Sequence, residues 1–580
     1  MIKRLLQCVR EYKTASILTP ICVTMESAME VVIPLLMASL IDKGIEAGNM
    51  AHVWKIGALL VLGALVSLLF GALGGSCAAK AGAGFARNLR HDIFYGVQKF
   101  SFSNIDKFSA SGIVTRLTTD VTNIQNAYMM LIRMAVRAPS MIVFSLIMAF
   151  SINRQVSLIF LGIIPFLGVA LYVIIRNVHP IFQRVFKTYD KLNNIVQENL
   201  RGIRVVKSFV REEHEKAKFA EVSQKIFTDF TKAEKIIAFN GPLMQFCVYV
   251  CMLLIAWVSA KLIVAGSMST GQLVSLISYI MMILMSLMML SFLFIMVIIS
   301  RASVERVSEI LTEVPDLANP KTPVYTVADG SISLRDVDFS YAKQADKLCL
   351  SGVNLDIRSG ETIGIIGGTG SSKSTLVQLI PRLYDVTAGE LLVGGRDVRD
   401  YDVETLRNAV AVVLQKNVLF SGTIKENLRW GNPDATDEEL IHACKLAQAD
   451  EFIRAFPDGY DTHIEQGGAN VSGGQKQRLC IARALLKKPK ILILDDSTSA
   501  VDTRTDAALR TAFREELPDT TKLIIAQRIS SISDADRILV MESGRIDAAG
   551  THEELLQTNR IYQEVYHSQM KGGDFDDEGR

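Results

Sequence analysis

The sequence predicts an α-helical membrane domain with six spans, followed by a soluble α/β domain. Before about residue 315 it contains several apolar runs of roughly 20 residues, the length that crosses a bilayer core. After about residue 325, short apolar runs alternate with polar turns, as in a soluble α/β domain. The chain is 49% hydrophobic with a mean hydropathy of +0.27, yet 21% of it is charged. Such a composition in 580 residues indicates two regions of different solvent preference.

The predicted spans lie near residues 16–41, 56–79, 128–152, 156–178, 237–263 and 272–299. The segments after the second and fourth spans are long, polar and rich in Lys and Arg, whereas the connections on the opposite side contain few basic residues. Because basic residues mark the cytoplasmic side, both termini and the soluble domain are expected there. The first apolar segment lacks a small-x-small cleavage site, and further spans follow it, so we expect a retained helix rather than a signal peptide.

The predicted domain limits are residues 1–315 for the membrane domain with two long intracellular loops, 316–330 for a linker and 331–570 for the soluble domain. The linker lies in TEVPDLANPKTPVYTVADGS, which has three prolines and no hydrophobic period. Residues 571–580 form a glycine-containing acidic tail, which we expect to be flexible. The formal charge of +2 gives no indication of a nucleic-acid partner.

Two acidic residues in the first span are candidates for a substrate pathway. Glu26 and Glu30 lie four residues apart and therefore share one helix face. A carboxylate is costly in hydrocarbon, so this face is expected to point into a cavity or into the bundle interior. The alternative is a pair of structural acids near a kink at Pro34. Arg133 and Arg137 in the third span are interpreted as snorkelling or interhelical anchors rather than as substrate ligands.

The last span is rich in methionine and reads YIMMILMSLMMLSFLFIMVIIS. Methionine is flexible and polarizable, which suits a surface that must fit several apolar partners. We therefore place Met282, Met285 and Met289 at the substrate cavity, although packing against lipid explains them almost as well. Cys247 and Cys251 share one apolar helix without a histidine or carboxylate beside them, so packing is favoured over metal binding.

A glycine-rich phosphate loop is predicted in IGIIGGTGSSKSTL, residues 363–376, where a short apolar strand meets the start of a helix. In this order, backbone N–H groups and the helix N-terminus surround phosphates, Lys373 adds positive charge and Ser374 reaches Mg²⁺. Ser372 occupies a position where a glycine is expected. The predicted phosphate-binding residues are Gly367, Gly368, Thr369, Gly370, Ser371, Ser372, Lys373, Ser374 and Thr375.

A second element, ILILDDSTSAVD at residues 491–502, reads as a buried strand that ends in two adjacent acids. Asp495 lies at the end of this strand, where a further Mg²⁺ ligand is needed. Between the two elements, VSGGQKQR at residues 471–478 is very similar to the LSGGQ signature of ABC transporters. Other elements of that family stand in order. Tyr341 in VDFSY matches the aromatic that stacks on adenine, Gln415 in VVLQKN matches the Q-loop, and Asp502 in SAVD matches the D-loop.

Six spans before a nucleotide domain resemble an ABC exporter half-transporter over nearly the whole chain. The resemblance implies a transmembrane domain of ABC exporter type, followed by an α/β P-loop ATPase domain with a helical subdomain. It also implies ATP and Mg²⁺ as cofactors, the ion being held by Ser374, Gln415 and Asp495. Segments near 103–109 and 201–209, the latter in ENLRGIRVVKSFVREEHE, look like coupling helices. The signature residues that would complete a partner's ATP site are Ser472, Gly473, Gly474 and Gln475.

Several residues of this pocket depart from the family pattern. The family usually has a glutamate as general base after the strand aspartate, and Asp496 stands there instead. Gln527 replaces the histidine that contacts the γ-phosphate, Ser372 replaces a glycine, and an upstream glutamate falls at Gln466. Aspartate is one methylene shorter than glutamate, and glutamine cannot carry the charge of histidine. The pocket is therefore expected to bind MgATP and to hydrolyse it poorly, with Asp496 as a weak base.

Two copies of this chain would form two identical impaired sites, yet the chain's own signature is intact. We therefore expect a heterodimer with a second half-transporter that supplies the catalytic glutamate and histidine. A homodimer with slow ATPase is the alternative. The pattern, together with LIRMAVRAPSMIVFSLIMAF in the third span, resembles the degenerate-site subunit of bacterial heterodimeric multidrug exporters. The implied function is ATP-driven efflux of hydrophobic or amphipathic compounds across the cytoplasmic (inner) membrane of a bacterium.

The same features bear on several other function classes. The six spans exclude a soluble ABC-type ATPase, and importers generally keep membrane and nucleotide domains on separate chains. A dedicated exporter or flippase for one lipid or peptide stays open, although no peptidase-like extension precedes the first span. A regulatory or channel-like protein that binds ATP without pumping also stays open.

Overall fold

The structure is a computed structural model, and it describes residues 2–341, 347–496 and 501–577. The chain divides into two compact units. The first consists of Met1–Gln98 and Ser109–Glu313, and the second of Lys99–Phe108 and Val314–Arg580. A short segment between two long helices of the first unit therefore belongs with the second. The linear domain limits given above stay a prediction.

The described part of the first unit is helical. Its α-helices are α1 (Ile2–Gln7), α2 (Lys13–Leu40), α3 (Met50–Val97), α5 (Ala110–Thr115), α6 (Val121–Ile152), α7 (Arg154–Arg201), α8 (Ile203–Ser208), α9 (Glu212–Ala238), α10 (Asn240–Val264) and α11 (Thr270–Thr312). Six helical segments of the described chain are long and apolar enough to cross a membrane, namely Arg10–Ile45, Met50–Val97, Ala110–Ile152, Arg154–Arg201, Glu212–Val264 and Thr270–Thr312. The predicted number of spans is confirmed.

The helices continue well beyond the apolar spans. Both α3 and α7 have 48 residues. At about 1.5 Å per residue such a helix is about 70 Å long, more than twice the roughly 30 Å of a hydrocarbon core. Beyond the apolar part the chain stays helical, and on α9 the charged side chains of Glu221 and Lys225 pair along the helix surface.

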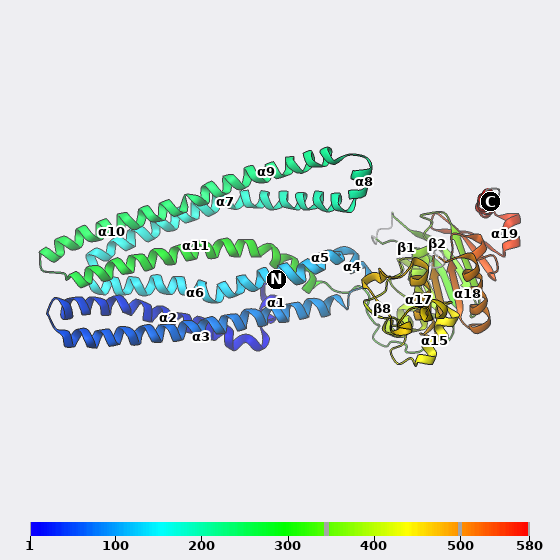
Figure 1. The fold of residues 1–580 in the computed structure, drawn as a ribbon, viewed down its shortest axis with the longest axis horizontal. Helices are drawn as coiled ribbons and strands as arrows, with labels where there is room; N and C mark the ends of the chain where they lie inside the picture. Colours follow the sequence, from blue (N-terminus) through cyan, green and yellow to red (C-terminus); the bar gives the residue numbers. More distant parts are fainter. Residues whose placement is uncertain (1, 342–346, 497–500, 578–580) are drawn as a thin grey trace. The chain divides into compact units, whose positions relative to one another are not determined.

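Within the first unit, α2 packs along α3, α6 along α11, and α7 along α9. Figure 1 shows these long helices running side by side. An apolar core lies where α6, α7, α10 and α11 meet, and its fully buried members include Phe160, Ile255 and Leu276. Cys247 and Cys251 belong to this core, 3% and 0% exposed, which confirms that they pack against apolar neighbours.

The second unit contains a six-stranded sheet of order β12–β11–β3–β10–β9–β6, a four-stranded antiparallel sheet of order β2–β1–β4–β5 and the short pair β7–β8. The strands are β1 (Ile332–Phe339), β2 (Leu350–Ile357), β3 (Thr362–Gly367), β4 (Ala388–Val393), β5 (Arg396–Asp397), β6 (Val410–Val413), β7 (Gly422–Thr423), β8 (His463–Ile464), β9 (Ile491–Asp495), β10 (Thr521–Ile525), β11 (Arg537–Glu542) and β12 (Arg545–Gly550). The helices are α4 (Phe102–Phe108), α12 (Lys373–Leu379), α13 (Val403–Ala409), α14 (Ile424–Arg429), α15 (Asp437–Leu446), α16 (Asp450–Arg454), α17 (Gly473–Leu485), α18 (Thr503–Glu516), α19 (His552–Thr558) and α20 (Arg560–Asp577).

The core strands of the six-stranded sheet are parallel, since β3 pairs with β10, β10 with β9, and β9 with β6. Ile525 of β10 lies opposite Ile365 on one side and Asp495 on the other. The C-terminal ends of these strands therefore meet at one edge, where ligands bind in open α/β sheets. Figure 1 shows α18 beside the sheet.

Four helices form the helical subdomain predicted from the sequence. α14, α15, α16 and α17 contribute Leu428, Leu440, Ile453 and Leu479 to one apolar cluster, and each of these residues is at most 1% exposed. The predicted fold class is therefore confirmed. At the C-terminal end, α20 extends to Asp577, into the segment where the sequence predicts a flexible tail, and residues 578–580 lie outside the described part.

Candidate functional site

The phosphate loop joins the end of β3 to the start of α12. Gly367 has a φ of +157°, and a Cβ at this residue would lie 2.2 Å from the carbonyl oxygen of Met541, so only glycine fits here. Ser372 has a φ of +69° and a ψ of 26°, in the left-handed region. A serine therefore stands in a backbone conformation that favours the glycine expected from the sequence.

Lys373 is folded back onto the phosphate loop. Its Nζ donates to the carbonyl oxygens of Gly367 and Gly368 at 2.8 and 2.9 Å, and to Oγ of Ser371 at 3.2 Å. Burial lowers the pKa of Lys373, while the charges of Asp495 and Asp496 oppose this change. The ammonium group is thus held at the loop where phosphates would bind, next to the N-terminus of α12.

Asp495 ends β9 beside the first turn of α12. Its Oδ1 accepts a hydrogen bond of 2.9 Å from Oγ of Ser374, and the residue is 4% exposed. Burial raises the pKa of Asp495, and the neighbouring charge of Asp496 adds to this, whereas the Ser374 hydrogen bond and Lys373 lower it. A carboxylate kept in such a place is unfavourable without a cation.

The residues at this sheet edge fit Mg²⁺, which prefers oxygen ligands. The hydroxyl of Ser374 and the carboxylate of Asp495 already meet, and the side chain of Gln415 is near. These three residues would hold the ion, which would offset the charge of nucleotide phosphates when bound. The described residues contain no cluster of three or more His, Cys, Asp or Glu side chains suited to a metal.

Asp496 is held by two glutamine side chains. Nε2 of Gln527 donates to its Oδ2 at 2.6 Å, and Nε2 of Gln415 donates to the same oxygen at 3.2 Å. Asp496 is 8% exposed and has a φ of +49°. Asp496 and Gln527, two of the four departures from the family pattern, therefore contact each other directly. Sequence reasoning placed both in one pocket but did not foresee this bond.

Tyr341 lies over the first turns of α12. Its hydroxyl is 3.1 Å from Oγ1 of Thr375 and donates to Oε1 of Gln378 at 3.4 Å. Burial raises the pKa of this phenol. Its ring packs edge-on against Tyr384, with ring centroids 5.1 Å apart. The side chain of Tyr341 thus contacts Thr375, a predicted phosphate-binding residue. The sequence identifies both motifs, but it does not predict that these two residues touch.

The signature residues lie at the start of α17, whereas the phosphate loop leads into a different helix, α12. Ser472 caps α17, where its Oγ accepts from the backbone N–H of Gln475 at 3.3 Å and the Gln475 side chain accepts from the Ser472 N–H at 2.9 Å. Asp502 caps α18 by accepting from the backbone N–H of Thr505 at 2.9 Å, and this hydrogen bond lowers the pKa of that carboxyl. Gly473 and Gly474 form the first turn of α17, and residues 497–500 of the adjoining element lie outside the described part.

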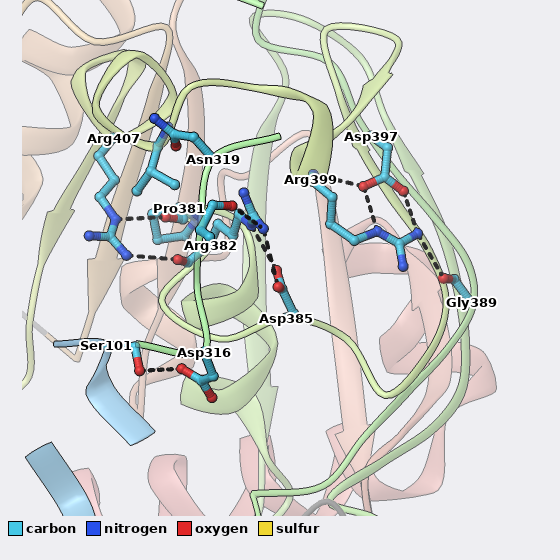
Figure 2. Close-up of polar contacts among 12 residues, drawn as sticks. Ser101, Asp316, Asn319, Pro381, Arg382, Asp385, Gly389, Asp397, Arg399 and Arg407 are labelled. Atoms are coloured by element: carbon cyan, nitrogen blue, oxygen red, sulfur yellow. Dashed lines mark hydrogen bonds and ion pairs between the residues drawn. The ribbon is translucent and has the colours of Figure 1, made fainter. Parts of the chain in front are cut away.

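In the second unit, α4 coincides with the first predicted coupling helix, and α8 of the first unit coincides with the second. Asp316 of the linker accepts hydrogen bonds from Ser101 and from Ser103, the latter at 2.7 Å. Figure 2 shows the Ser101 contact beside the loop that carries Arg382, which itself donates to Asp385 at 2.7 Å. Tyr384 hydroxyl donates to Asp106 of α4 at 2.9 Å.

The membrane candidates fall into two groups. Arg137 of α6 binds both acids of α2, with Nη1 2.5 Å from Oε1 of Glu26 and Nη2 2.7 Å from Oε1 of Glu30. Arg137 is therefore an interhelical anchor, as predicted, and the acids share one face. In α11, Met282 packs against the apolar core, Met285 is 63% exposed and Met289 is half-buried. The three methionines differ in exposure although their spacing places them on one face of α11, and their role at a cavity stays a prediction.

Comparison with known proteins agrees with the order of the motifs. Residues 16–303 match the family described as ABC transporter transmembrane region, and residues 350–499 match the family described as ABC transporter. The chain is 37% identical to the ABC transporter ATP-binding protein YfiB of Bacillus subtilis over 569 residues, 98% of this chain and 99% of YfiB.

Two further relatives bear functional names. The chain is 32% identical over 491 residues to the ATP-dependent lipid A-core flippase of Desulfotalea psychrophila, which covers 84% of this chain and 85% of the flippase. It is 30% identical over 582 residues to YgaD of Bacillus subtilis, named for multidrug export as an ATP-binding/permease protein, with 98% of this chain and 99% of YgaD covered. The chain therefore belongs to the ABC transporter family, as an exporter half-transporter whose six-span transmembrane region is fused to an ATPase domain.

Proposed function

We propose that this chain drives the efflux of hydrophobic or amphipathic compounds across the cytoplasmic membrane, as one subunit of a heterodimer. Its own ATP site would be the slow one, and its signature would complete the partner's competent site. The observation that carries the proposal is the hydrogen bonding of Asp496 Oδ2 by both Gln415 and Gln527. We further propose that both termini and the nucleotide domain lie on the cytoplasmic side.

The geometry of Asp496 supports slow hydrolysis. A general base must reach the attacking water, and its correct placement contributes about 10²–10⁴ in rate. The carboxylate is on a shorter side chain than the usual glutamate, and two amide groups already donate to one of its oxygens. A misplacement of about 1 Å can lose roughly a hundredfold in rate. Gln527 also offers the γ-phosphate a neutral amide in place of an imidazolium.

The intact signature supports a partner with a different site. Ser472 and Gln475 form a complete capping box at the N-terminus of the 13-residue helix α17, so backbone N–H groups are presented in order for a phosphate. Such a signature can act only opposite the phosphate loop of another subunit, where the two together would form one ATP site. If that site belonged to a second copy, it would contain the same Asp496 and Gln527. A partner with glutamate and histidine resolves this conflict.

The residues of this chain suggest how closure of the nucleotide domains reaches the membrane. Lys373, the phosphate loop and Tyr341 would hold the nucleotide, Gln415 would respond to it, and α4 and α8 would transmit the movement to the spans. Nucleotide would favour the closed state because it binds that state better, which shifts the population towards an outward-open cavity. Hydrolysis at the partner's site would reset the cycle.

A lipid or peptide exporter is the second candidate, favoured by the likeness to a flippase at 32% identity. Both candidate functions share the same arrangement of ATP sites, a slow site on this chain and a competent site on its partner, so one experiment tests that arrangement for both. ATPase activity is measured for the chain alone and with its partner subunit, each with and without Asp496→Glu. A weak homomer, and an active pair that is insensitive to Asp496→Glu, would support the proposal. Strong activity from the chain alone would contradict it. Nucleotide-dependent accumulation of amphipathic dyes or of labelled lipid in vesicles then separates the two substrate classes.

A further inference from the structure

The carboxylate oxygens of Glu26 and Glu30 are not equally satisfied. Arg137 donates to Oε1 of Glu26 at 2.5 Å and to both oxygens of Glu30 at 2.7 and 2.9 Å. Oε2 of Glu26 is buried and has no hydrogen-bond partner among the residues that the structure describes, and the whole residue is 8% exposed. A buried carboxylate oxygen that lacks a donor is unfavourable, so this oxygen points to a ligand.

The same cluster contains more negative than positive charge. Two carboxylates face one guanidinium, and Arg133 forms no ion pair with either acid within the described residues. Arg133 lies instead beside α3, where its Nη1 would be 4.0 Å from a Cβ on Gly75. With both acids ionised, the cluster has one uncompensated negative charge in a membrane span, where charges are costly and generally functional.

A glycine on α3, Gly71, makes room for the side chain of Glu26. A Cβ on Gly71 would lie 3.0 Å from Oε1 and 3.2 Å from Cδ of Glu26, so a larger residue would press on the carboxyl group. The side chains of Glu30 and Arg137 are 26% and 21% exposed, compared with 11% for Glu26. The cluster is therefore accessible at Glu30 and Arg137, and Glu26 with its unpaired oxygen is its most buried side chain.

We propose that Oε2 of Glu26 binds the protonated amine of transported compounds, which makes organic amines the preferred substrate class. The inference rests on the efflux function proposed above and deepens it. An ammonium group supplies both missing components, an N–H donor for the unpaired oxygen and a positive charge for the cluster. A neutral amide of the same apolar shape supplies no positive charge and only a weaker N–H donor. Glu26 is then a specificity-determining residue, while Arg137 holds Glu26 and Glu30 in position.

Dansylcadaverine, a fluorescent primary amine, and its N-acetyl derivative provide probes with the same apolar body. Binding to the purified full-length chain is followed by dansyl fluorescence, and ATP-dependent uptake is followed in everted vesicles that contain the assembled exporter. We expect the amine to be preferred about tenfold over the amide in both assays, the value of one hydrogen bond to a charged group. Glu26→Gln should abolish this preference and leave the amide unchanged.

Glu30→Gln is the matched control, because it removes the same charge but leaves Oε2 of Glu26 in place, and it should retain most of the preference. A preference that survives Glu26→Gln, or that falls equally in Glu30→Gln, would overturn the assignment. If Glu26→Gln does not fold, Gly71→Ala gives a second test, since its methyl group would displace the carboxyl and weaken amine binding alone. Amine binding that depends on Glu26 without any uptake would contradict efflux but support the site. Equal uptake of both probes would support efflux and contradict the site.

Discussion

The side-chain amide of Gln527 lies 2.6 Å from Oδ2 of Asp496, and this is the shorter of the two hydrogen bonds that reach that oxygen. Gln527, predicted to replace a histidine that contacts the γ-phosphate, thus holds Asp496, predicted to replace a catalytic glutamate. The two positions should therefore act together on hydrolysis and show a non-additive effect.

The first prediction concerns this pair. Asp496→Glu with Gln527→His should raise the ATP turnover of the chain alone by roughly 10- to 100-fold, because a base of the usual length is restored beside an imidazole. Asp496→Glu alone should give a smaller gain, since Gln527 still donates to the carboxylate. Steady-state phosphate release measures both, and the same pair in a Lys373→Ala background serves as the control. A double variant no faster than the parent chain would contradict the assignment of the slow site.

Ser372 gives the second prediction, which concerns stability. Its φ of +69° lies in the left-handed region, where a residue with a Cβ is less stable than glycine by about 1 kcal/mol. Ser372→Gly should therefore stabilise the nucleotide domain by up to about 1 kcal/mol, less the added entropy of the unfolded chain. Ser371→Gly is the matched control, because Ser371 is 5% exposed and is absent from the positive-φ positions of the described chain. We expect thermal unfolding to show a gain at 372 and a loss at 371, and the reverse order would contradict the strain argument.

The third prediction concerns the hydroxyl of Tyr341. Because it contacts Thr375 at 3.1 Å, it competes with the nucleotide for that residue. Tyr341→Phe keeps the ring and removes the competing hydrogen bond, so nucleotide affinity should increase about two- to fivefold. Tyr341→Ala removes the ring as well and should weaken binding. Titration with a fluorescent ATP analogue distinguishes the two, and a lower affinity in Tyr341→Phe would show that the hydroxyl aids binding.

Much of this site could be predicted because its positions follow from motif order and strand direction. Lys373 follows β3 and Asp495 ends β9, and parallel pairing brings such ends together whatever the details of packing. The contacts of Gln527 with Asp496 and of Tyr341 with Thr375 depend instead on rotamers chosen in the folded domain, which no spacing reveals. The membrane residues show the same limit. A four-residue spacing placed Glu26 and Glu30 on one face, but only packing of α2 against α6 could show that Arg137 binds both.

The fourth prediction concerns the pH dependence of stability at Asp495. Burial raises the pKa of Asp495 in the folded domain above its ordinary value of 3.8, so the native state binds the proton more tightly than the unfolded chain. Stability contributed by this proton is present below pH 3.8 and is lost as the pH rises through the folded pKa. Asp495→Asn removes the charge, so it should stabilise the nucleotide domain at pH 7 without Mg²⁺, and the gain should vanish on acidification. Thermal unfolding between pH 4 and 8 measures this.

The control for Asp495 is the response to MgATP. The parent chain should gain stability when MgATP is added, because bound ligand stabilises the folded state. Asp495→Asn should lose most of that gain, since one of the predicted Mg²⁺ ligands is missing. Asp519→Asn, an exposed aspartate before β10, should change neither behaviour. An Asp495→Asn variant less stable than the parent at pH 7 would mean that the hydrogen bond from Ser374 outweighs burial.

The last prediction concerns the attachment of α4 to its own nucleotide domain. Asp316 accepts hydrogen bonds from both Ser101 and Ser103, so Asp316→Ala should loosen α4 while the nucleotide site stays intact. Basal ATPase of the assembled exporter should then change little, whereas its stimulation by transported probes should fall about fivefold, the scale of a weak coupling energy. Asp397→Ala is the matched control, because Asp397 binds Arg399 at 2.6 Å away from α4, as Figure 2 shows. The ratio of stimulated to basal activity is the measurement. If Asp316→Ala retained that ratio, or if Asp397→Ala lost it equally, the linker contact would be structural and α4 would be coupled through Tyr384 and Asp106 instead.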